Sequence, residues 1–506
     1  MKVLLFYPNF YGMNMLPPAI GLFTSILRQN GHEVALFDTT VYDDIGSESG
    51  TTINFDKKKS ESLSARPYDD TLLKDGVKKS DPVEDLMSLI NNFGPDLIAM
   101  SCTEDMYPLG VGILKRLGQN RPRVVLGGVF ATSAPKLALE KAENTVDYLL
   151  TGEGENTFPE FCRRLEMGEE MDGLEGCWYY KNGSLITNNL PMPVDVNKIP
   201  LPDYSLFQES RFYRPMQGKL WRMFPIETHR GCPYTCAYCN TPAMISRYKD
   251  EDKRFFRKKS IDNIEQEIKH CIKNYNADSF YFWADTFLAW TNKEFDQFCE
   301  MYSAFKLPFW IQTRAETITE YRIEQLKEVG LLRIAFGIEH GNEEFRYKML
   351  HRKIKNDIII DRLNIVHDLG IPFSVNNIIG FPEENRELAF DTIELNRHIK
   401  SDGINAYTFT PFHGTPLRQL AEDTGLVAND ELARSLFNPS LLKMKQFPPE
   451  EIEGVRRCFT LYVYMPKSRW PDIAKAEKLT PEGDAIWNDL REECLTHYVR
   501  YQEELD

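Results

Sequence analysis

Three cysteines lie within eight residues near the middle of the chain, and this cluster constrains the protein more than any other feature. Three residues separate Cys232 from Cys236, and two separate Cys236 from Cys239. A structural zinc site usually takes four ligands as two distant pairs, and no second Cys or His pair follows at such spacing. Three thiolates on one loop instead suit three irons of a cubane [4Fe–4S] cluster, whose fourth iron stays open to a non-protein ligand. The spacing therefore predicts an iron–sulfur centre, with incidental cysteines as the alternative.

The same loop resembles the motif of the radical S-adenosylmethionine (SAM) enzymes. Cys232, Cys236 and the pair Tyr238-Cys239 match that motif position by position. Gly231 suits a sharp loop that exposes its sulfurs. The resemblance implies that the three cysteines bind the cluster and that Tyr238 belongs to the cofactor site. It also implies that the open iron binds SAM, which is split to methionine and a 5′-deoxyadenosyl radical.

Length and composition indicate a globular protein of about three domains. The chain has 506 residues, of which 42% are hydrophobic. No stretch approaches the ~20 apolar residues of a membrane span, and the apolar run at residues 3–8 is too short for a signal peptide. The seven cysteines outside the motif show no paired spacing, so we expect reduced thiols and a cytoplasmic protein. The net charge of −15 disfavours nucleic acid as a substrate.

Strands and helices alternate over the first 155 residues. Apolar runs separated by helical patterns predict a doubly wound, Rossmann- or flavodoxin-like parallel sheet, which we assign to a first domain at 1–155. Residues 43 to about 82 are polar, and we expect a long excursion there. The predicted strands are 2–7, 33–38, 96–101, 123–128 and 146–151.

Three loops follow strands of this predicted sheet, at the edge where such sheets bind ligands. Glycines in two of them permit the backbone to approach a large flat ligand. In this order, ahead of a radical SAM motif, the loops resemble the cobalamin-binding domain that is fused to one class of these enzymes. The resemblance implies a cobalamin site formed by Ser101, Thr103, Glu104, Gly127, Gly128, Val129, Phe130, Gly152, Glu153 and Gly154.

The chain departs from the wider cobalamin pattern at the lower ligand of cobalt. Many cobalamin domains carry an Asp-x-His-x-x-Gly loop whose imidazole binds cobalt, and no such motif occurs here. Phe130 also stands where relatives often have histidine. We therefore expect cobalamin without a protein histidine ligand. A degenerate flavodoxin-like domain that serves packing or substrate capture is the alternative.

The remainder of the chain predicts a linker and two further domains. Residues 156–222 include an Asn182-Gly183 turn signal and a proline-rich segment, and we interpret them as a linker. Residues 223–425 alternate again and predict a parallel partial (β/α)6 barrel, the radical SAM domain, with its site at the strand ends. Residues 426–506 predict a small α-helical C-terminal domain. The predicted barrel strands are 225–228, 279–285, 309–314, 333–339, 373–380 and 403–410.

Several residues at these strand ends match SAM-binding positions of the family. The resemblance implies that Asp285 accepts hydrogen bonds from the amino group of SAM and that Arg314 pairs with its carboxylate. It implies that Glu339 takes the ribose hydroxyls. A charged residue at a strand end is often only solvated or ion-paired. The other predicted cofactor-binding residues here are Asn376, Gly380 and Phe381, the last two in the loop that resembles the adenine side.

Two histidines stand out against the family pattern. The family often has serine at the position of His340, and Gly or Pro near that of His413. Either histidine would suit an acid or a base. The alternative is a structural histidine whose hydrogen bonds are satisfied within the fold.

The resemblance as a whole implies a cobalamin-dependent radical SAM enzyme. We expect it to methylate an unactivated carbon of a small molecule through a 5′-deoxyadenosyl radical and methylcobalamin. A radical cyclisation or ring rearrangement with the same cofactors is one alternative, and a non-catalytic metal-bound interaction module is another. The expected partners are a small-molecule substrate and an electron donor such as flavodoxin or ferredoxin. No motif identifies the substrate.

Overall fold

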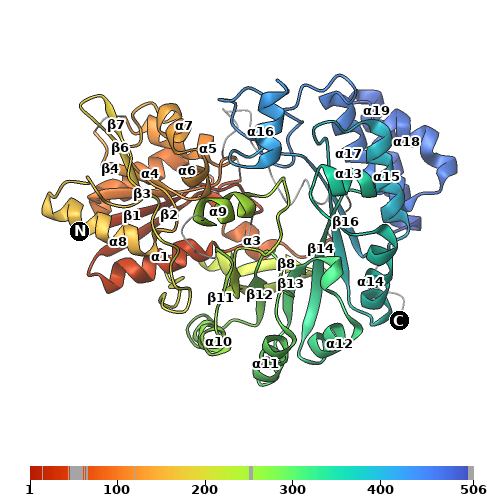
Figure 1. The fold of residues 1–506 in the computed structure, drawn as a ribbon, viewed down its shortest axis with the longest axis horizontal. Coiled ribbons are helices and arrows are strands. Elements are labelled where there is room, and N and C mark those ends of the chain that lie inside the picture. Colours follow the sequence, from red (N-terminus) through yellow and green to blue (C-terminus); the bar gives the residue numbers. More distant parts are fainter. Residues whose placement is uncertain are drawn as a thin grey trace. The chain divides into compact units, whose positions relative to one another are not determined.

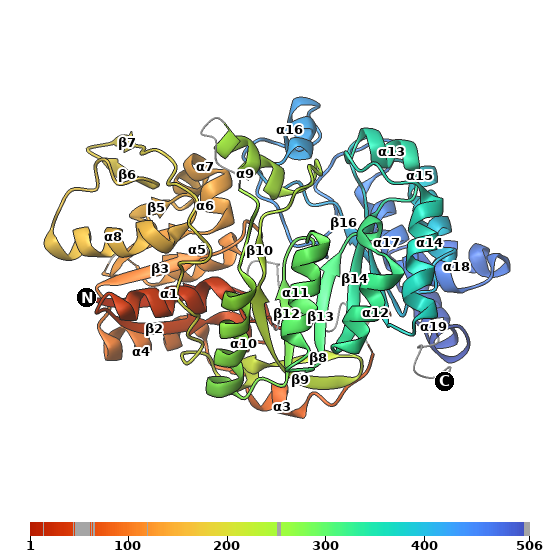
Figure 2. The same cartoon turned by 60° about the horizontal axis from the view of Figure 1, so that its bottom comes forward.

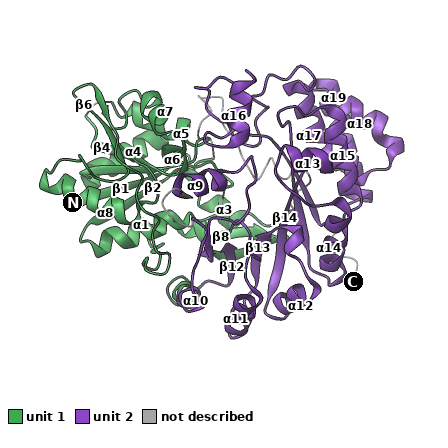
Figure 3. Cartoon of the chain, viewed as in Figure 1, with its two compact units in different colours: residues 1–57, 68–225, 267–276 green, residues 58–67, 226–266, 277–506 purple. Residues whose placement is uncertain are grey.

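The computed structural model describes residues 1–13, 15–43, 45, 61, 63, 66–118, 120–249 and 255–499. They form two compact units, shown in Figure 3. Unit 1 comprises residues 1–57, 68–225 and 267–276, and unit 2 comprises residues 58–67, 226–266 and 277–506. Residues 46–60 of the polar excursion predicted from residue 43 lie outside the described residues.

The sheet of unit 1 has the strand order of flavodoxin-like folds. Its parallel strands run in the order β2-β1-β3-β4-β5. The sequence prediction of a doubly wound parallel sheet is thus confirmed. Two antiparallel strands, β6 and β7, extend the sheet beyond β5, although the sequence placed this hairpin in a linker. The strands are β1 (Lys2–Tyr7), β2 (Glu33–Asp38), β3 (Leu97–Ser101), β4 (Arg123–Gly127), β5 (Tyr148–Leu150), β6 (Cys177–Lys181) and β7 (Ser184–Ile186).

Helices cover both faces of this sheet. Helix α1 packs beside α8, and α4 beside α5; right-handed crossovers put these two pairs on opposite faces. The elements can be followed in red and orange in Figure 1. The helices of unit 1 are α1 (Pro18–Gln29), α3 (Thr71–Asp75), α4 (Pro82–Phe93), α5 (Tyr107–Arg116), α6 (Val129–Ser133), α7 (Pro135–Lys141) and α8 (Gly154–Met167), with short 3-10 turns at Thr39–Val41 and Glu209–Phe212.

The second sheet is the curled half-barrel that the alternating pattern predicts. Its order is β16-β15-β14-β13-β12-β9-β8, and β12 to β16 are parallel. In β12, Phe280 and Phe282 are fully buried, and the ring of Phe282 packs on Phe298 of α11. The strands are β8 (Tyr213–Met216), β9 (Lys219–Glu227), β12 (Ser279–Trp283), β13 (Phe309–Thr313), β14 (Leu331–Glu339), β15 (Phe373–Ile379) and β16 (Gly403–Thr408).

Helices form the outer layer of the half-barrel in unit 2, as Figure 2 shows for α11, α12 and α14. The helices from residue 240 to residue 423 are α9 (Asn240–Lys249), α10 (Ile261–Tyr275), α11 (Asn292–Tyr302), α12 (Glu320–Glu328), α13 (Glu343–Lys348), α14 (Asn356–Asp368), α15 (Arg386–Arg397) and α16 (Pro416–Asp423), with a 3-10 turn at Ala315–Thr317. All belong to unit 2 except residues 267–275 of α10, which belong to unit 1. A two-stranded sheet of β10 (His229–Arg230) and β11 (Arg257–Lys258) flanks the cysteine loop.

The C-terminal part of unit 2 is helical, as predicted. Helix α17 (Pro449–Tyr464) packs on β16 and α15, and α18 (Trp470–Ala476) and α19 (Pro481–His497) pack on α17. Arg386 of α15 forms ion pairs with Glu477 and Glu451, which tie these helices to the half-barrel. Among the described residues, no helix is both long enough and apolar enough to span a membrane.

Candidate functional site: a cysteine loop and convergent strand ends in unit 2

The cysteine loop is fixed by its backbone between β10 and α9. Gly231 has φ +85°, and a Cβ there would lie 2.9 Å from the ring of Phe255, so only glycine fits. The N–H of Ala237 donates to the carbonyl of Leu350 at 3.2 Å, and its carbonyl accepts from the N–H of Leu417 at 3.0 Å. The segment after α13 (Glu343–Lys348) and the first turn of α16 (Pro416–Asp423) thus both hold the cysteine loop.

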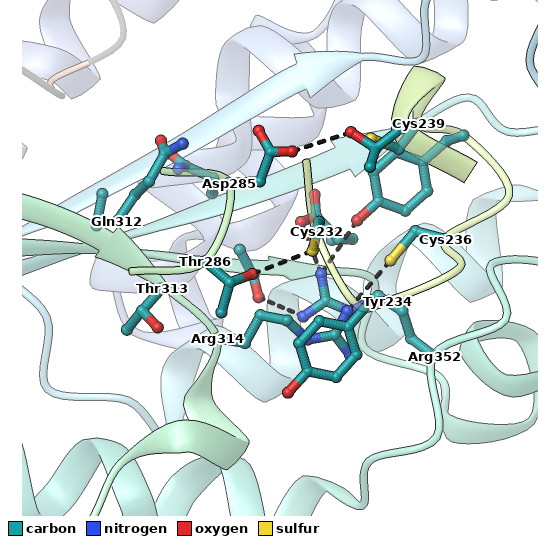
Figure 4. A pocket seen from close by; sticks show the side chains of 16 residues that line it. Cys232, Tyr234, Cys236, Cys239, Asp285, Thr286, Gln312, Thr313, Arg314 and Arg352 are labelled. Carbon is teal, nitrogen blue, oxygen red and sulfur yellow. Dashed lines mark hydrogen bonds and ion pairs between the residues drawn. The ribbon is translucent and has the colours of Figure 1, made fainter. Parts of the chain in front are cut away.

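The three cysteines line one pocket together with polar residues from the strand ends, as Figure 4 shows. The cavity of this pocket has a volume of about 220 Å³. It brings together Cys232, Cys236, Cys239, Tyr238, Asp285, Arg314, Glu339 and Asn376 from the sequence prediction.

Two of the sulfurs accept or share hydrogen bonds. Arg314 Nη1 donates to Cys236 Sγ at 3.2 Å, and Cys232 Sγ lies 3.4 Å from Thr286 Oγ1. The Arg314 guanidinium also covers the ring of Tyr234 at 3.7 Å. Burial raises the pKa of Cys232, and it raises the pKa of Cys239 to about 11. Both shifts favour the protonated thiols of Cys232 and Cys239, and a bound metal cation would favour their thiolates.

The donor set fits a cluster. All three cysteines are free of disulfides, and all face one pocket. Among the described residues, no three His, Cys, Asp or Glu side chains converge closely enough to hold a single metal ion. A cubane distributes its cysteine ligands over three irons, so its sulfurs need not meet at one point. The three-cysteine loop can hold such a group.

Asp285 follows β12 and points into the pocket. Its Oδ2 accepts a hydrogen bond from Thr241 Oγ1 at 2.9 Å. Burial raises the pKa of Asp285, and the Thr241 hydroxyl opposes that shift. A positively charged ligand group beside this carboxylate would lower its pKa again and form a charge-assisted hydrogen bond with it.

Glu339 ends β14 and forms a buried network with Arg352 and Tyr238. Arg352 Nη1 donates to Glu339 Oε1 at 2.9 Å and to the Tyr238 hydroxyl at 3.1 Å, while Nη2 donates to the carbonyl of Gly337 at 2.8 Å. Burial raises the pKa of Glu339, and the charge of Arg352 opposes this. The network connects the cysteine loop to the end of β14, and Glu339 lines the pocket.

Gly380 and Phe381 are not among the residues that line the pocket. The Phe381 side chain is fully buried and packs on Phe409, with ring centroids 5.0 Å apart. Sequence reasoning missed other residues that do line it: Tyr234, Thr241, Thr286, Gln312, Thr313, Ala335, Gly337 and Arg352. Thr286, Thr313 and Gly337 lie at strand ends or just beyond, so the strand-end rule could have found them. Arg352 comes from a loop after α13 and carries no such signal.

The predicted cobalamin residues occupy the loops after β3, β4 and β5 in unit 1. Gly128 has φ +100°, and a Cβ there would lie 2.6 Å from the carbonyl of Cys102, so the turn after β4 requires glycine. The Thr132 hydroxyl accepts from the N–H of Gly152 at 2.9 Å, which joins the second and third loops. Gly128 and Gly152 are thus required by close packing within unit 1.

The side chains in these loops differ in their exposure. Val129 is 46% exposed, whereas Phe130 is buried and packs edge-on against Tyr107 at 4.9 Å. Glu153 accepts a hydrogen bond from the N–H of Val194 at 2.7 Å, and Thr103 donates to Asp105 at 2.5 Å. Phe130 thus contributes to the core of unit 1, and burial raises the pKa of Asp105.

A curled parallel sheet that presents three free cysteines beside convergent polar strand ends defines an iron–sulfur enzyme of the radical type. Residues 226–395 match the model of the Radical SAM superfamily, and residues 62–162 match that of the B12 binding domain. The chain therefore contains a radical SAM domain and a B12 binding domain. Its cofactors are a [4Fe–4S] cluster, SAM and cobalamin.

Similar proteins share most of the chain. An uncharacterized methyltransferase, PH0819, of Pyrococcus horikoshii is 26% identical over 81% of this chain and 87% of its own. The anaerobic magnesium-protoporphyrin IX monomethyl ester cyclase of Cereibacter sphaeroides is 24% identical over 76% of this chain and 62% of its own.

Solved structures show the same fold. The radical SAM methyltransferase TsrM of Kitasatospora setae, solved with cobalamin and a [4Fe–4S] cluster, superposes with a TM-score of 0.62 at 13% identity, over 98% of this chain and 99% of its own. The cobalamin-dependent radical enzyme OxsB superposes with a TM-score of 0.65 at 16% identity, over 98% of this chain and 71% of its own.

Proposed function

We propose that this protein is a methyltransferase that transfers a methyl group to an unactivated carbon of a small molecule. The observation that carries the proposal is the single pocket that joins three free cysteines with Asp285, Arg314 and Glu339, in a chain that also has a B12 binding domain. A methyltransferase relative that aligns over most of both chains supports it.

Within this pocket, the chain's own residues would bind and orient SAM. The carboxylate of Asp285 accepts from an ammonium group, and the guanidinium of Arg314 pairs with a carboxylate. The carboxylate of Glu339, which Arg352 orients through Oε1, would accept from ribose hydroxyls. When bound, the cluster with SAM supplies a 5′-deoxyadenosyl radical, and cobalamin supplies methyl transfer.

The overall reaction balances with two electrons. One substrate C–H and two SAM, with two electrons, give one C–CH3, 5′-deoxyadenosine, methionine and S-adenosylhomocysteine. The substrate hydrogen ends on 5′-deoxyadenosine, and the methyl comes from the second SAM. We therefore propose a low-potential donor such as flavodoxin or ferredoxin as partner, in the cytoplasm, where ten free cysteines are stable.

The test uses the anaerobically reconstituted protein with cobalamin, a chemical reductant, SAM carrying a deuterated methyl group, and a small-molecule extract. We expect a product that gains CD3, with equal amounts of S-adenosylhomocysteine and 5′-deoxyadenosine. The variant with all three motif cysteines changed to alanine is the control and should form no 5′-deoxyadenosine. Formation of 5′-deoxyadenosine with no transferred label would contradict methyl transfer.

A second candidate is a radical cyclase or ring-rearranging enzyme with the same cofactors. The cyclase relatives favour it, since one of them is 24% identical over 76% of this chain. The same experiment separates the methyltransferase from the cyclase. A cyclase would convert SAM to 5′-deoxyadenosine without forming S-adenosylhomocysteine. Its product would also be lighter than the substrate through loss of hydrogen, rather than heavier through gain of a methyl group.

A further inference from the structure

His340 and Glu384 form a fully enclosed pair in unit 2. Both side chains have zero exposure, and His340 Nε2 lies 3.2 Å from Glu384 Oε1. His340 follows Glu339 directly at the end of β14, and Glu384 lies just past the end of β15. The pair therefore connects two neighbouring strand ends, and neither residue lines the cofactor pocket.

The hydrogen bonds of His340 define its tautomer. The backbone N–H of Asn342 donates to His340 Nδ1 at 3.1 Å, and a backbone N–H can only donate. Nδ1 is therefore unprotonated, so the proton of the neutral ring is on Nε2, which donates to Glu384. The ring also stacks on Phe345, with centroids 4.4 Å apart and planes inclined by 29°.

The other oxygen of Glu384 fixes the turn after β15. Glu384 Oε2 accepts from the backbone N–H of Gly380 at 2.5 Å and from that of Phe381 at 2.8 Å. Gly380 has φ +84°, so the turn adopts a conformation that costs little only for glycine. One carboxylate thus satisfies two buried backbone donors and the imidazole.

The turn that carries Glu339 is equally constrained. Glu339 has φ +70°, which is an unfavourable region for a residue with a side chain. The next glycine, Gly341, donates its N–H to Thr392 Oγ1 at 2.9 Å, and a Cβ on it would lie 2.1 Å from the carbonyl of Asp391. The backbone around Glu339 is held in this strained form by its neighbours, among which His340 makes the bridge to β15.

We propose that His340 is a positioning residue that, through Glu384, braces the end of β14 against the turn after β15 and so fixes the Glu339 carboxylate at the pocket. The inference rests on the proposed placement of SAM in this pocket. It explains why histidine is useful at this position: a serine side chain is too short to reach Glu384 while the turn keeps its conformation.

The test measures the dissociation constant for SAM of the reconstituted protein by equilibrium dialysis, in a series of variants. His340→Asn keeps an acceptor for the Asn342 N–H but does not reach Glu384, and we expect about tenfold weaker SAM binding. His340→Gln places an amide N–H near the position of Nε2, and we expect binding within about threefold of the wild type. His398→Asn, at an exposed histidine, is the matched control.

Hydrogen exchange supplies a second readout. In His340→Asn the peptide that spans Gly380 and Phe381 should exchange faster, while peptides of unit 1 should keep their rates. A merely structural histidine would lower the unfolding temperature without a selective change in SAM affinity or in this peptide. The iron and sulfide content of each variant confirms that the cluster is loaded.

The outcomes are separable. If His340→Asn binds SAM as tightly as the wild type, or if His340→Gln fails to fold or to restore binding, this inference is overturned although the proposed function stands. If the loaded wild type does not bind SAM, the proposed function itself fails. Selective weakening in the asparagine variant with recovery in the glutamine variant supports the inference.

Discussion

Arg352 is a single side chain on which three parts of the pocket depend, since it bonds to Glu339, to Tyr238 and to the carbonyl of Gly337. Replacement by alanine leaves the buried Glu339 carboxylate unpaired. We expect Arg352→Ala to lose about 3 kcal/mol of unfolding free energy, as broken buried ion pairs do. Anaerobic denaturant unfolding measures it.

Arg352→Lys keeps the charge but not the planar donors, so it should fall between the wild type and the alanine variant. Lys355→Ala, at an exposed lysine nearby, should change stability by no more than about 0.5 kcal/mol. Equal losses in Arg352→Ala and Lys355→Ala would refute the role of this network.

Arg314 acts at one sulfur, because its guanidinium donates to Cys236 Sγ at 3.2 Å. A hydrogen bond and a positive charge at a ligand sulfur stabilise the reduced, more negative cluster. We expect Arg314→Gln to lower the cluster reduction potential by about 60 mV, equivalent to about 1.4 kcal/mol for one electron.

A redox titration of the SAM-free protein, followed by electron paramagnetic resonance, tests this. Arg314→Lys retains the charge and should recover part of the shift. An unchanged potential in Arg314→Gln would show that the contact does not tune the cluster.

The sequence identified residues whose position follows from strand ends and missed residues brought in by loops. Asp285, Arg314 and Glu339 end predicted strands, and parallel strands bring their carboxyl ends together. Arg352 comes from an irregular segment between α13 and α14, where no sequence periodicity predicts the direction of a side chain. Phe130 and Phe381 stand at positions that the family resemblance assigns to cofactor binding, but both rings are buried in the protein. Burial of an apolar ring in the core is more favourable than its exposure at the edge of a cofactor.

Among the elements, the small sheet of β10 and β11 supports the cysteine loop through His229. The imidazole is 2% exposed, lies edge-on to Trp290 at 4.3 Å and stacks parallel to Phe256. Burial lowers the pKa of His229 to about 3, against 6.5 for the free group. Since the folded-state pKa is below the unfolded value, its stabilising contribution is present above pH 6.5 and is lost as pH falls towards 3.

This shift predicts an acid-sensitive region around the cysteine loop. Between about pH 7.5 and pH 5.5 the wild type should lose about 1.4 kcal/mol through this one group. His229→Phe keeps the aromatic contacts and cannot be protonated, so its stability should decline less over the same interval. His398→Asn should follow the wild type. Parallel curves for His229→Phe and the wild type would disprove the assignment.

Element types were predictable, whereas some pairings were not. The Asn182-Gly183 turn predicts a hairpin, and β6 and β7 do form one. Nothing local indicates that β6 pairs antiparallel with β5, because that register depends on contacts distant in the chain. The pairing of the parallel strands was easier to predict, since buried apolar strands that alternate with helices allow few topologies.

For the whole molecule, the division into two units predicts separable ligand responses. The cysteine pocket lies in unit 2, and the loops proposed for cobalamin lie in unit 1. Removal of the cluster by a chelator should abolish the stabilisation by SAM, which at a hundredfold excess over its dissociation constant is about 2.7 kcal/mol. Stabilisation by cobalamin should persist.

Differential scanning calorimetry measures the stabilisation by SAM and by cobalamin, each for the protein with its cluster and for the chelated protein. The untreated protein serves as control. Loss of both stabilisations on chelation would mean that the two sites do not fold independently.

The distribution of thiols has a practical consequence for any preparation of this enzyme. Nine of its ten cysteines are buried and Cys239 is partly exposed. In molecules that lack the cluster, alkylation at mildly alkaline pH should therefore modify Cys239 first. The reaction should be slow, because burial raises the pKa of Cys239 to about 11. Intact-protein mass spectrometry would then give the fraction of molecules with a single adduct. This fraction equals the fraction that lacks a cluster, and it is known before any activity is measured.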